Sequence, residues 1–304
     1  MRGMHVRQDG MLLNQDLESI DKVAYEAKEE ELTARTVVGL KTDDHEGAET
    51  ISYDKMTRRG AAKIFAYGAS DDIPLVDADV ERHTQKVYGV VVGFTIGIQE
   101  KRAAQMANRT IDITKAIAAR RAVAEKENRF FYVGSEAHQA EGLLNFTGIQ
   151  TMPVALNAGE TSTKWKDKTS EEIIEDIRLA RKKVNALPGL TVDTLLLPPN
   201  QYEDLDKPVN AENYNMTIRK WLQEQKWFTN IIRVADLEGA GDSSTDCLAV
   251  FDSSKDVVEM ALPLDITRHP EVMLANMSSQ INLEERTGGA IVRFPMGICR
   301  ADGI

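Results

Sequence analysis

Residues 87–98 read VYGVVVGFTIGI and residues 100–129 read EKRAAQMANRTIDITKAIAARRAVAEKENR, and these two stretches decide the fold. In the first stretch, apolar side chains recur at every second position from Val90 to Ile98. Successive side chains of a strand point to opposite faces, so this alternation predicts a β-strand with one buried face. The glycines also form two overlapping G-x-x-x-G patterns, typical of packed membrane helices. The stretch is too short and too rich in β-branched residues for that alternative, so we expect a strand.

Residues 100–129 predict one long helix. The stretch holds no proline or glycine and is rich in alanine, arginine, lysine and glutamate. As a single helix it is about 45 Å long. Eight basic residues against four acidic ones suggest nucleic-acid binding, but no heptad pattern of a basic-region reader follows, so we expect a structural spine. The positions expected in its buried stripe are Ala103, Met106 or Ala107, Ile111, Ile113, Ile117 and Val123.

Upstream of these stretches the sequence predicts two elements that need a neighbour. Apolar residues at helical spacing between Leu13 and Ala27 predict an acidic amphipathic helix, which is either a solvated surface helix or an arm that lies on another subunit. Residues 53–65 predict a polar hairpin with its turn near Arg59–Gly60. A long two-stranded arm is not stable alone in water, so we expect the hairpin to contact another subunit. Its basic residues are the candidate inter-subunit contacts: Lys55, Arg58, Arg59 and Lys63.

Downstream, residues 151–246 predict an α/β unit. Thr169-Ser-Glu-Glu172 is a capping box that opens a helix, which Pro188–Gly189 ends. A buried strand at 194–197, a helix at 216–225 and paired strands at 231–237 and 247–251 are expected to follow. After residue 252 the chain is mainly β, and Thr287-Gly-Gly289 predicts a closing hairpin.

The search for chemistry is negative. No phosphate-binding loop, complete dinucleotide-binding loop, nucleophile elbow or zinc-protease motif occurs. Asp77 and Asp79, followed by Glu81 and His83, form the densest group of metal-ligand residue types, but a solvated connection after Pro74 is the favoured interpretation. We therefore expect no catalytic residue, no cofactor and no metal, and a protein that is not an enzyme.

Charge and composition limit the class of partner. The net charge of −11 disfavours a general nucleic-acid binder, because affinity for phosphate comes from clustered positive charge. Two cysteines, Cys247 and Cys299, form neither a metal motif nor a disulfide framework, which favours a reducing compartment. Residues 1–10 hold no apolar run typical of a secretion signal, and no apolar stretch is long enough to span a membrane. We therefore expect synthesis in the cytoplasm and no membrane partner.

The order of these elements resembles the major capsid proteins of tailed phages, which have the Hong Kong 97-like fold. Three stretches support the resemblance: EGLLN at 141–145, LLLPPNQY at 195–202 and ERTGGAIVRFP at 285–295. Further short matches, at 49–53, 72–77 and 118–121, resemble a prophage branch of that family. The resemblance covers nearly the whole chain, in the family's order.

The resemblance implies an α+β fold in four parts. These are an N-arm at 1–50, an extended β-hairpin E-loop at 51–98, a peripheral domain with the spine helix at 99–150 and 252–304, and an α/β axial domain at 151–251.

The resemblance also implies a function. It predicts a subunit that assembles with itself, as hexamers and pentamers, into an icosahedral virion shell made in the host cytoplasm. That shell encloses DNA without sequence-specific binding, and portal, scaffolding and decoration proteins are candidate partners. The alternatives are an encapsulin-like cage subunit and, in another class, a small-molecule enzyme built on the α/β unit.

Overall fold

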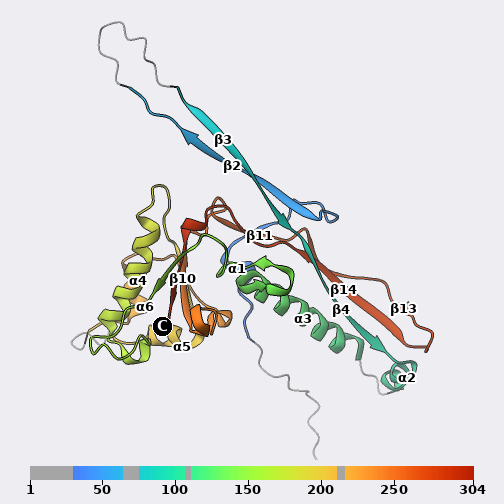
Figure 1. Cartoon of the computed structure of the whole chain (residues 1–304). Helices are drawn as coiled ribbons and strands as arrows, with labels where there is room; N and C mark the ends of the chain where they lie inside the picture. The colour runs from blue at the N-terminus through green and yellow to red at the C-terminus, as the bar shows by residue number, and fades with distance from the viewer. Residues whose placement is uncertain (1–29, 64–74, 107–110, 211–215) are drawn as a thin grey trace, which may run out of the picture. The chain divides into compact units, whose positions relative to one another are not determined.

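A computed structural model of the chain describes residues 30–63, 75–106, 111–210 and 216–304 (Figure 1). The chain divides into two compact units, Met1–Glu31 and Leu32–Ile304, and the second holds every helix and strand described below. The amphipathic helix expected near residues 13–27 lies outside the described residues. Sheets and helices are mixed along the second unit, so the predicted α+β class is confirmed.

The alternating stretch forms β4 (Tyr88–Ile96), as predicted. It pairs antiparallel over its whole length with β14 (Ser279–Thr287), whose other edge pairs with β12 (Leu264–Arg268) and β13 (Val272–Met273). Every second residue of β4 from Val90 onward is at least half-buried and the residues between are exposed, so the predicted face is the inner one.

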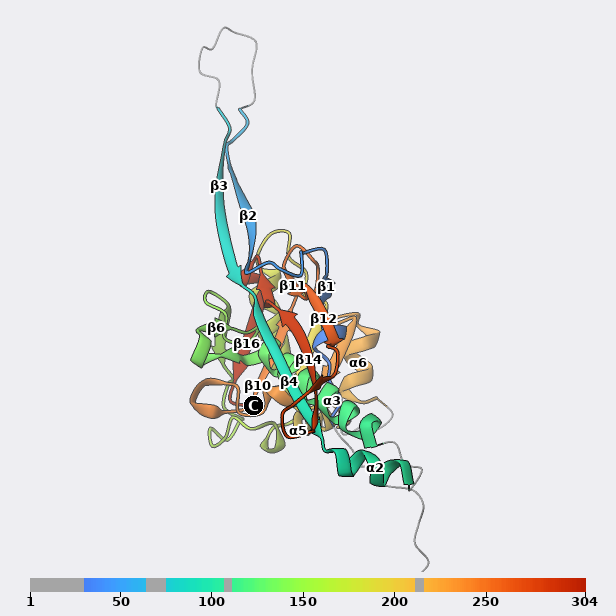
Figure 2. The same ribbon diagram turned by 90° about the vertical axis from the view of Figure 1, so that its right-hand side faces the viewer.

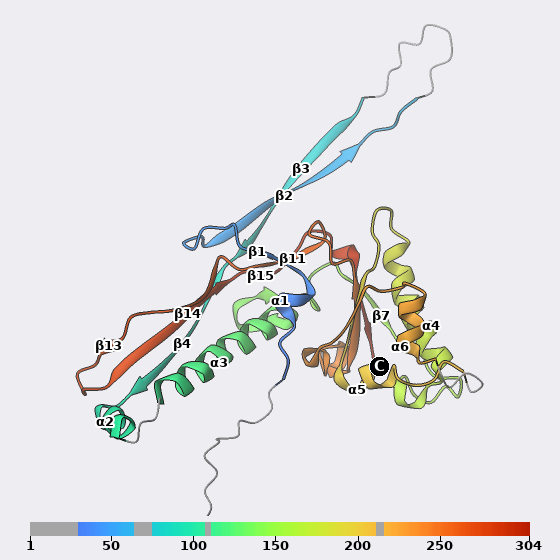
Figure 3. The same cartoon turned by 180° about the vertical axis from the view of Figure 1, so that it is seen from behind.

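The long helix is described as two helices, α2 (Ile98–Met106) and α3 (Ile111–Val133), on either side of residues 107–110. Their axes point in different directions in all three views (Figures 1, 2 and 3). The single helix predicted from about Glu100 to Arg129 is therefore described as two helices. Helix α3 runs through Ile111 to Arg120 without a break, as predicted.

The buried positions agree only in part with the predicted stripe. Val123 on α3 is buried as predicted, but Ile117 on α3 is 54% exposed, and Met106, the last residue of α2, is 93% exposed. The residues Phe131 and Tyr132, near the C-terminus of α3, are fully buried and were not predicted. Helical spacing identifies apolar positions but not which of them meet a second element. Here α1 (Ala34–Val37) and neighbouring strands contact α3 and help to bury its C-terminal part.

The polar hairpin is longer than predicted. Strand β2 (Thr50–Arg59) pairs antiparallel with β3 (Asp77–Lys86), in a register that runs from Thr50 opposite Lys86 to Arg59 opposite Asp77. The predicted turn at Arg59–Gly60 is wrong, because strand pairing continues through Arg59 and the chain returns only at Asp77. The expected solvated connection around Asp77 is instead the start of β3, which leads on into β4 (Figure 2).

A five-stranded sheet has the order β7 (Gln150–Pro153), β16 (Ile298–Asp302), β10 (Cys247–Phe251), β8 (Thr194–Leu197) and β9 (Asn230–Arg233). Its helices are α4 (Ser170–Asn185), α5 (Pro199–Asp204) and α6 (Ile218–Glu224). The predicted capping box at Thr169 is present and opens α4. The predicted pairing of β9 with β10 is wrong, because β8 lies between them and bonds to both.

The predicted closing hairpin is also wrong. Strand β15 (Gly289–Val292) does not pair with β14 but joins β11 (Val258–Ala261) and β1 (Gly39–Lys41) in a separate sheet. Gly289 makes this change of sheet possible. It has a φ of +68°, and a Cβ atom there would lie 2.8 Å from the ring of Phe130.

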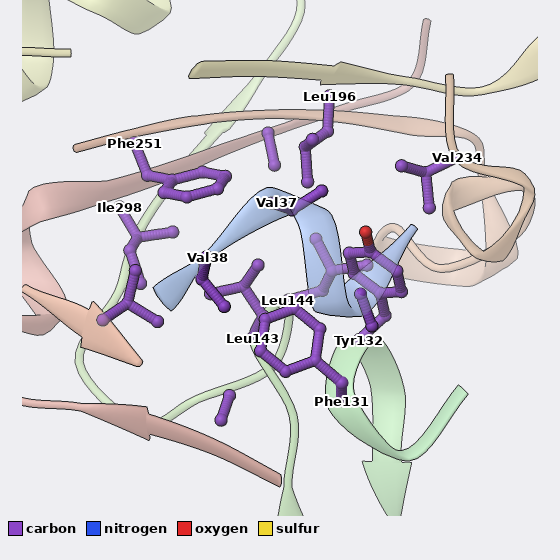
Figure 4. Close-up of a cluster of buried hydrophobic side chains, with 14 of the residues drawn as sticks. Val37, Val38, Phe131, Tyr132, Leu143, Leu144, Leu196, Val234, Phe251 and Ile298 are labelled. Atoms are coloured by element: carbon purple, nitrogen blue, oxygen red, sulfur yellow. The ribbon is translucent and has the colours of Figure 1, made fainter. Parts of the chain in front are cut away.

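One hydrophobic core joins these sheets near the C-terminal end of α3 (Figure 4). Phe131 and Tyr132 pack there with Leu143 and Leu144, and with residues from strands on both sides. The Leu143 and Leu144 amides donate to the carbonyls of Phe131 and Tyr132, at 2.8 and 3.0 Å. The division into four parts remains a prediction. It groups residues 298–302 with the spine helix, whereas these residues form β16, which pairs with β10 in the five-stranded sheet.

Candidate functional site

The predicted contact residues do not form one patch. Lys55, Arg58 and Arg59 lie on β2, and Lys63 is exposed beyond the end of the strand. Because side chains alternate along a strand, Lys55 and Arg59 share one face of the hairpin and Arg58 occupies the other. The basic residues that the sequence analysis treated as one group therefore lie on both faces of the hairpin.

The face of the hairpin that carries Lys55 is partly held by its own chain. The Lys55 ammonium lies 5.1 Å from the centre of the Phe294 ring, a cation–π contact. On the same face Tyr53 stacks on His83, with ring centres 5.5 Å apart, and the Tyr53 hydroxyl donates to the carbonyl of Val292 at 3.1 Å. Burial raises the pKa of Tyr53 above its usual value. This face therefore turns toward β15 at its base.

Gln85 provides the strongest polar anchor of the hairpin base. Its amide nitrogen Nε2 donates to the carbonyl oxygens of Gly288 and Ala290, at 2.6 and 2.9 Å. Ile51 is 4% exposed and packs with Ala261 and Ile291. The sequence analysis missed these anchors, although the apolar and aromatic side chains at 51 and 53 were a signal for one buried face.

The distal half of the hairpin is exposed on both faces. Met56 and Val80 lie directly opposite one another, and each is 58% exposed. On the same face, Arg82 makes two hydrogen bonds to the Asp54 carboxylate, at 2.7 and 3.0 Å, which hold the pKa of Asp54 below its usual value. An isolated two-stranded ribbon is marginally stable in water, so this half of the hairpin lacks a core of its own.

The remaining basic residues lie on this distal half. Arg59 is 3.5 Å from Asp79 on the opposite strand, and both side chains are more than half exposed. Such a pair contributes only about 0–1 kcal/mol. Arg58 is exposed on the face that carries Met56 and Val80. Of the four predicted contact residues, Arg58 is thus the one on β2 that shares a face with the apolar pair.

Metal-ligand residue types are not grouped at this site within the described residues. There, no three or more His, Cys, Asp or Glu side chains are grouped to hold a metal ion. The cavity beside Trp165, Gln201 and Asp246, about 440 Å³ in volume, is lined without a histidine or cysteine. Among the helices described, none is long and apolar enough to cross a membrane.

Comparison with solved structures identifies the fold. The capsid of Myoviridae phage XM1 superposes with a TM-score of 0.80 at 14% identity, covering 98% of this chain and 100% of that chain. Gordonia phage Cozz gives a TM-score of 0.66 at 12% identity, covering 95% and 92%. A virus-like particle from Pyrococcus furiosus gives 0.61 at 15% identity, covering 88% and 90%. At these identities the likeness shows the fold, which is that of Hong Kong 97-like capsid proteins.

Sequence comparison gives the family. No curated protein matches the sequence. A family model described as "Major capsid protein" matches residues 60–304, which include β3 and every element after it that the structure describes. Because this match takes in well over half of the chain, the protein belongs to the major capsid protein family.

Proposed function

We propose that this major capsid protein builds the icosahedral head shell of a tailed phage from hexamers and pentamers of itself. The shell encloses a double-stranded DNA genome in the virion, and assembly takes place in the host cytoplasm. The protein acts as a structural subunit without catalysis or a cofactor. Portal, scaffolding and decoration proteins are its further candidate partners.

The exposed distal half of the β2–β3 hairpin is the observation that carries this proposal. Its base is fixed by Ile51, Tyr53 and Gln85, but beyond Lys55 the described residues of both strands are exposed. Covering the apolar side chains of Met56 and Val80 with another surface removes them from water, and this burial stabilises the contact. A neighbouring subunit is the partner that a shell supplies in every copy.

The basic residues of the hairpin give its side of this contact a positive charge. We expect Lys55, Arg58, Arg59 and Lys63 to meet acidic surface on neighbouring subunits, since the chain carries 48 acidic against 37 basic residues. Each exposed ion pair contributes about 0–1 kcal/mol. Symmetry repeats that contribution in every subunit of a closed shell.

Charge reversal on the hairpin tests the contact. The double variant Arg58→Glu, Arg59→Glu is expected to fold normally and to form far fewer shells by electron microscopy and sedimentation. The control Lys164→Glu, Lys166→Glu makes the same change in net charge away from the hairpin, and is expected to assemble better than the hairpin variant. Normal shells from the hairpin variant refute the contact, and equal losses in both variants mean that net charge, not the hairpin, controls assembly.

Two other functions are less well supported. An encapsulin-like cage predicts shells without a genome, and nucleic-acid analysis of particles from host cells distinguishes it from a phage head. A small-molecule enzyme predicts a small oligomer with a substrate pocket.

For a phage head, a net charge of −11 predicts weak, salt-sensitive and sequence-independent binding of free subunits to duplex DNA. Tight binding that discriminates between sequences contradicts a passive container.

A further inference from the structure

Two of the three tryptophans lie together on one side of the five-stranded sheet. Trp221 on α6 and Trp227 beyond it meet edge to face, with ring centres 4.9 Å apart. On α4, which covers the same side of the sheet (Figures 1 and 3), the Arg181 guanidinium lies 5.3 Å from the centre of the Trp227 ring. This is a cation–π contact. The three side chains are half-buried, and they form what we call the Arg–Trp cluster.

The cluster contains hydrogen-bond donors and no acceptor. Guanidinium and indole groups only donate. In the described part of the chain, no acceptor bonds to the Arg181 guanidinium or to either indole N–H, and Nε of Arg181 is buried without a partner. Burial lowers the pKa of Arg181, and no carboxylate among the described residues opposes this effect. The cluster therefore lacks an anion to complete it.

The charges around the cluster do not supply that anion. Arg178, one turn before Arg181, already holds Glu175 through two hydrogen bonds of 2.6 Å. Lys182, next to Arg181, is exposed and forms no ion pair with a described residue. Carboxylates and phosphates are the groups that a guanidinium binds most strongly. The cluster therefore fits an acidic partner.

The other side of the five-stranded sheet carries an acidic segment. Ile177 of α4 packs on one face of the sheet, whereas Leu237 and Ala240 pack on the other. Glu238 lies between these last two residues and Asp242 follows them, and both acidic side chains are exposed without an ion pair to a described residue. Copies placed head to tail around an axis bring two such opposite sides together.

We propose that the Arg–Trp cluster binds the acidic 238–242 segment of a neighbouring copy. The contact is head to tail and repeats around each hexamer and pentamer, so the inference rests on the proposed shell. The carboxylates accept hydrogen bonds from the guanidinium and the indole N–H groups, and the partner covers the two rings. Tryptophan and arginine are among the residues that most often carry the binding energy of an interface.

Duplex DNA is the other anionic partner in a phage head. Aromatic rings contribute to nucleic-acid binding by stacking on unpaired bases, and a double-stranded genome offers none. Duplex DNA therefore matches only the charge of the cluster, whereas an acidic protein surface matches both the charge and the rings.

Tryptophan fluorescence reports on this contact, because Trp165, the third tryptophan, is 1% exposed and the other two form the cluster. Acrylamide quenching of the full-length wild type is compared before and after assembly. Because a formed interface excludes water from its centre, the quenching constant is expected to fall by about twofold or more on assembly.

Two sets of substitutions remove the contact from either side. Arg181→Gln, and separately the double variant Glu238→Gln, Asp242→Asn, are each expected to raise the subunit concentration needed for assembly by about tenfold. The control Arg178→Gln removes the same charge from the same helix, but Arg178 is paired with Glu175 of its own chain. The control is expected to assemble as the wild type does.

The outcomes separate this contact from the shell itself. Wild-type shells whose tryptophans are quenched as strongly as in the free subunit overturn the contact, and so does normal assembly of either variant. If Arg181→Gln does not fold, the carboxylate variant and the wild-type quenching decide. Protection by duplex DNA without self-association assigns the cluster to phosphate and also overturns the contact. If the wild type forms rings but no shell, the shell proposal fails and protection in the rings supports the contact, whereas a wild type that stays monomeric overturns both.

Discussion

Replacing Gln85 by alanine is the most informative change at the hairpin base. The side chain donates two hydrogen bonds, to the carbonyls of Gly288 and Ala290. Each such bond contributes about 0.5–1.5 kcal/mol net, so their loss is expected to weaken docking of the base by about 1–3 kcal/mol. Gln85 is only half-buried, so water can replace part of the loss and the lower half of that range is expected.

This change in free energy is measurable as local opening. At about 1.4 kcal/mol for each factor of ten, amides of β2 and β3 are expected to exchange roughly tenfold faster in unassembled Gln85→Ala than in wild type. The control is Thr84→Ala, which removes a hydroxyl that hydrogen-bonds to the Ser52 hydroxyl across the strand pair and leaves the anchors intact. Its exchange at the hairpin base is expected to remain near wild type.

If Gln85→Ala and Thr84→Ala give the same exchange rates as wild type, the two carbonyl bonds do not hold the hairpin base. If both variants accelerate exchange equally, pairing between β2 and β3, rather than docking on β15, limits opening.

Three further changes test the fold of the chain, each measured by chemical denaturation of the unassembled subunit. Gly289→Ala is expected to destabilise by about 1–3 kcal/mol or more, because it places a Cβ against the Phe130 ring at positive φ, and unchanged stability contradicts the change of sheet there. Thr169→Ala removes the side chain that accepts from the Glu172 amide and is expected to cost about 1 kcal/mol. Ile177→Ala empties a fully buried site on α4 and is expected to cost about 2–5 kcal/mol, and a value near zero means that α4 is not packed as described.

Local signals in the sequence predicted the elements that depend on local physics. The alternation in 87–98 specifies a strand with a definite buried face, and the capping box at Thr169 fixes the start of α4. The GLLN stretch at 142–145 lies where the chain folds back on the end of α3. In each case the decisive interactions lie within a few residues or follow from the period of the element.

Pairing between distant segments could not be predicted in the same way. Arg59–Gly60 and Thr287–Gly289 carry turn residues, but the first does not end the strand and the second leads into a different sheet. A turn signal does not say which strand becomes the partner. Met106 and Ile117 are apolar at helical spacing, yet nothing in their spacing tells whether another element covers them.

The candidate site shows the same limit. Its residue types were correctly expected on a polar hairpin, but their distribution over two faces depends on the strand boundaries. The hydrogen bonds of Arg35 to the carboxylates of Glu127 and Glu285 had no sequence signal, because these partners are 92 and 250 positions away.

Electron microscopy of purified full-length protein, reconstructed to side-chain resolution, tests the central claim most directly. The account predicts closed icosahedral shells of hexamers and pentamers in which the distal β2–β3 hairpin lies on a neighbouring subunit and covers Met56 and Val80. Monomers or small oligomers under assembly conditions, or shells in which this half of the hairpin remains exposed to solvent, contradict it.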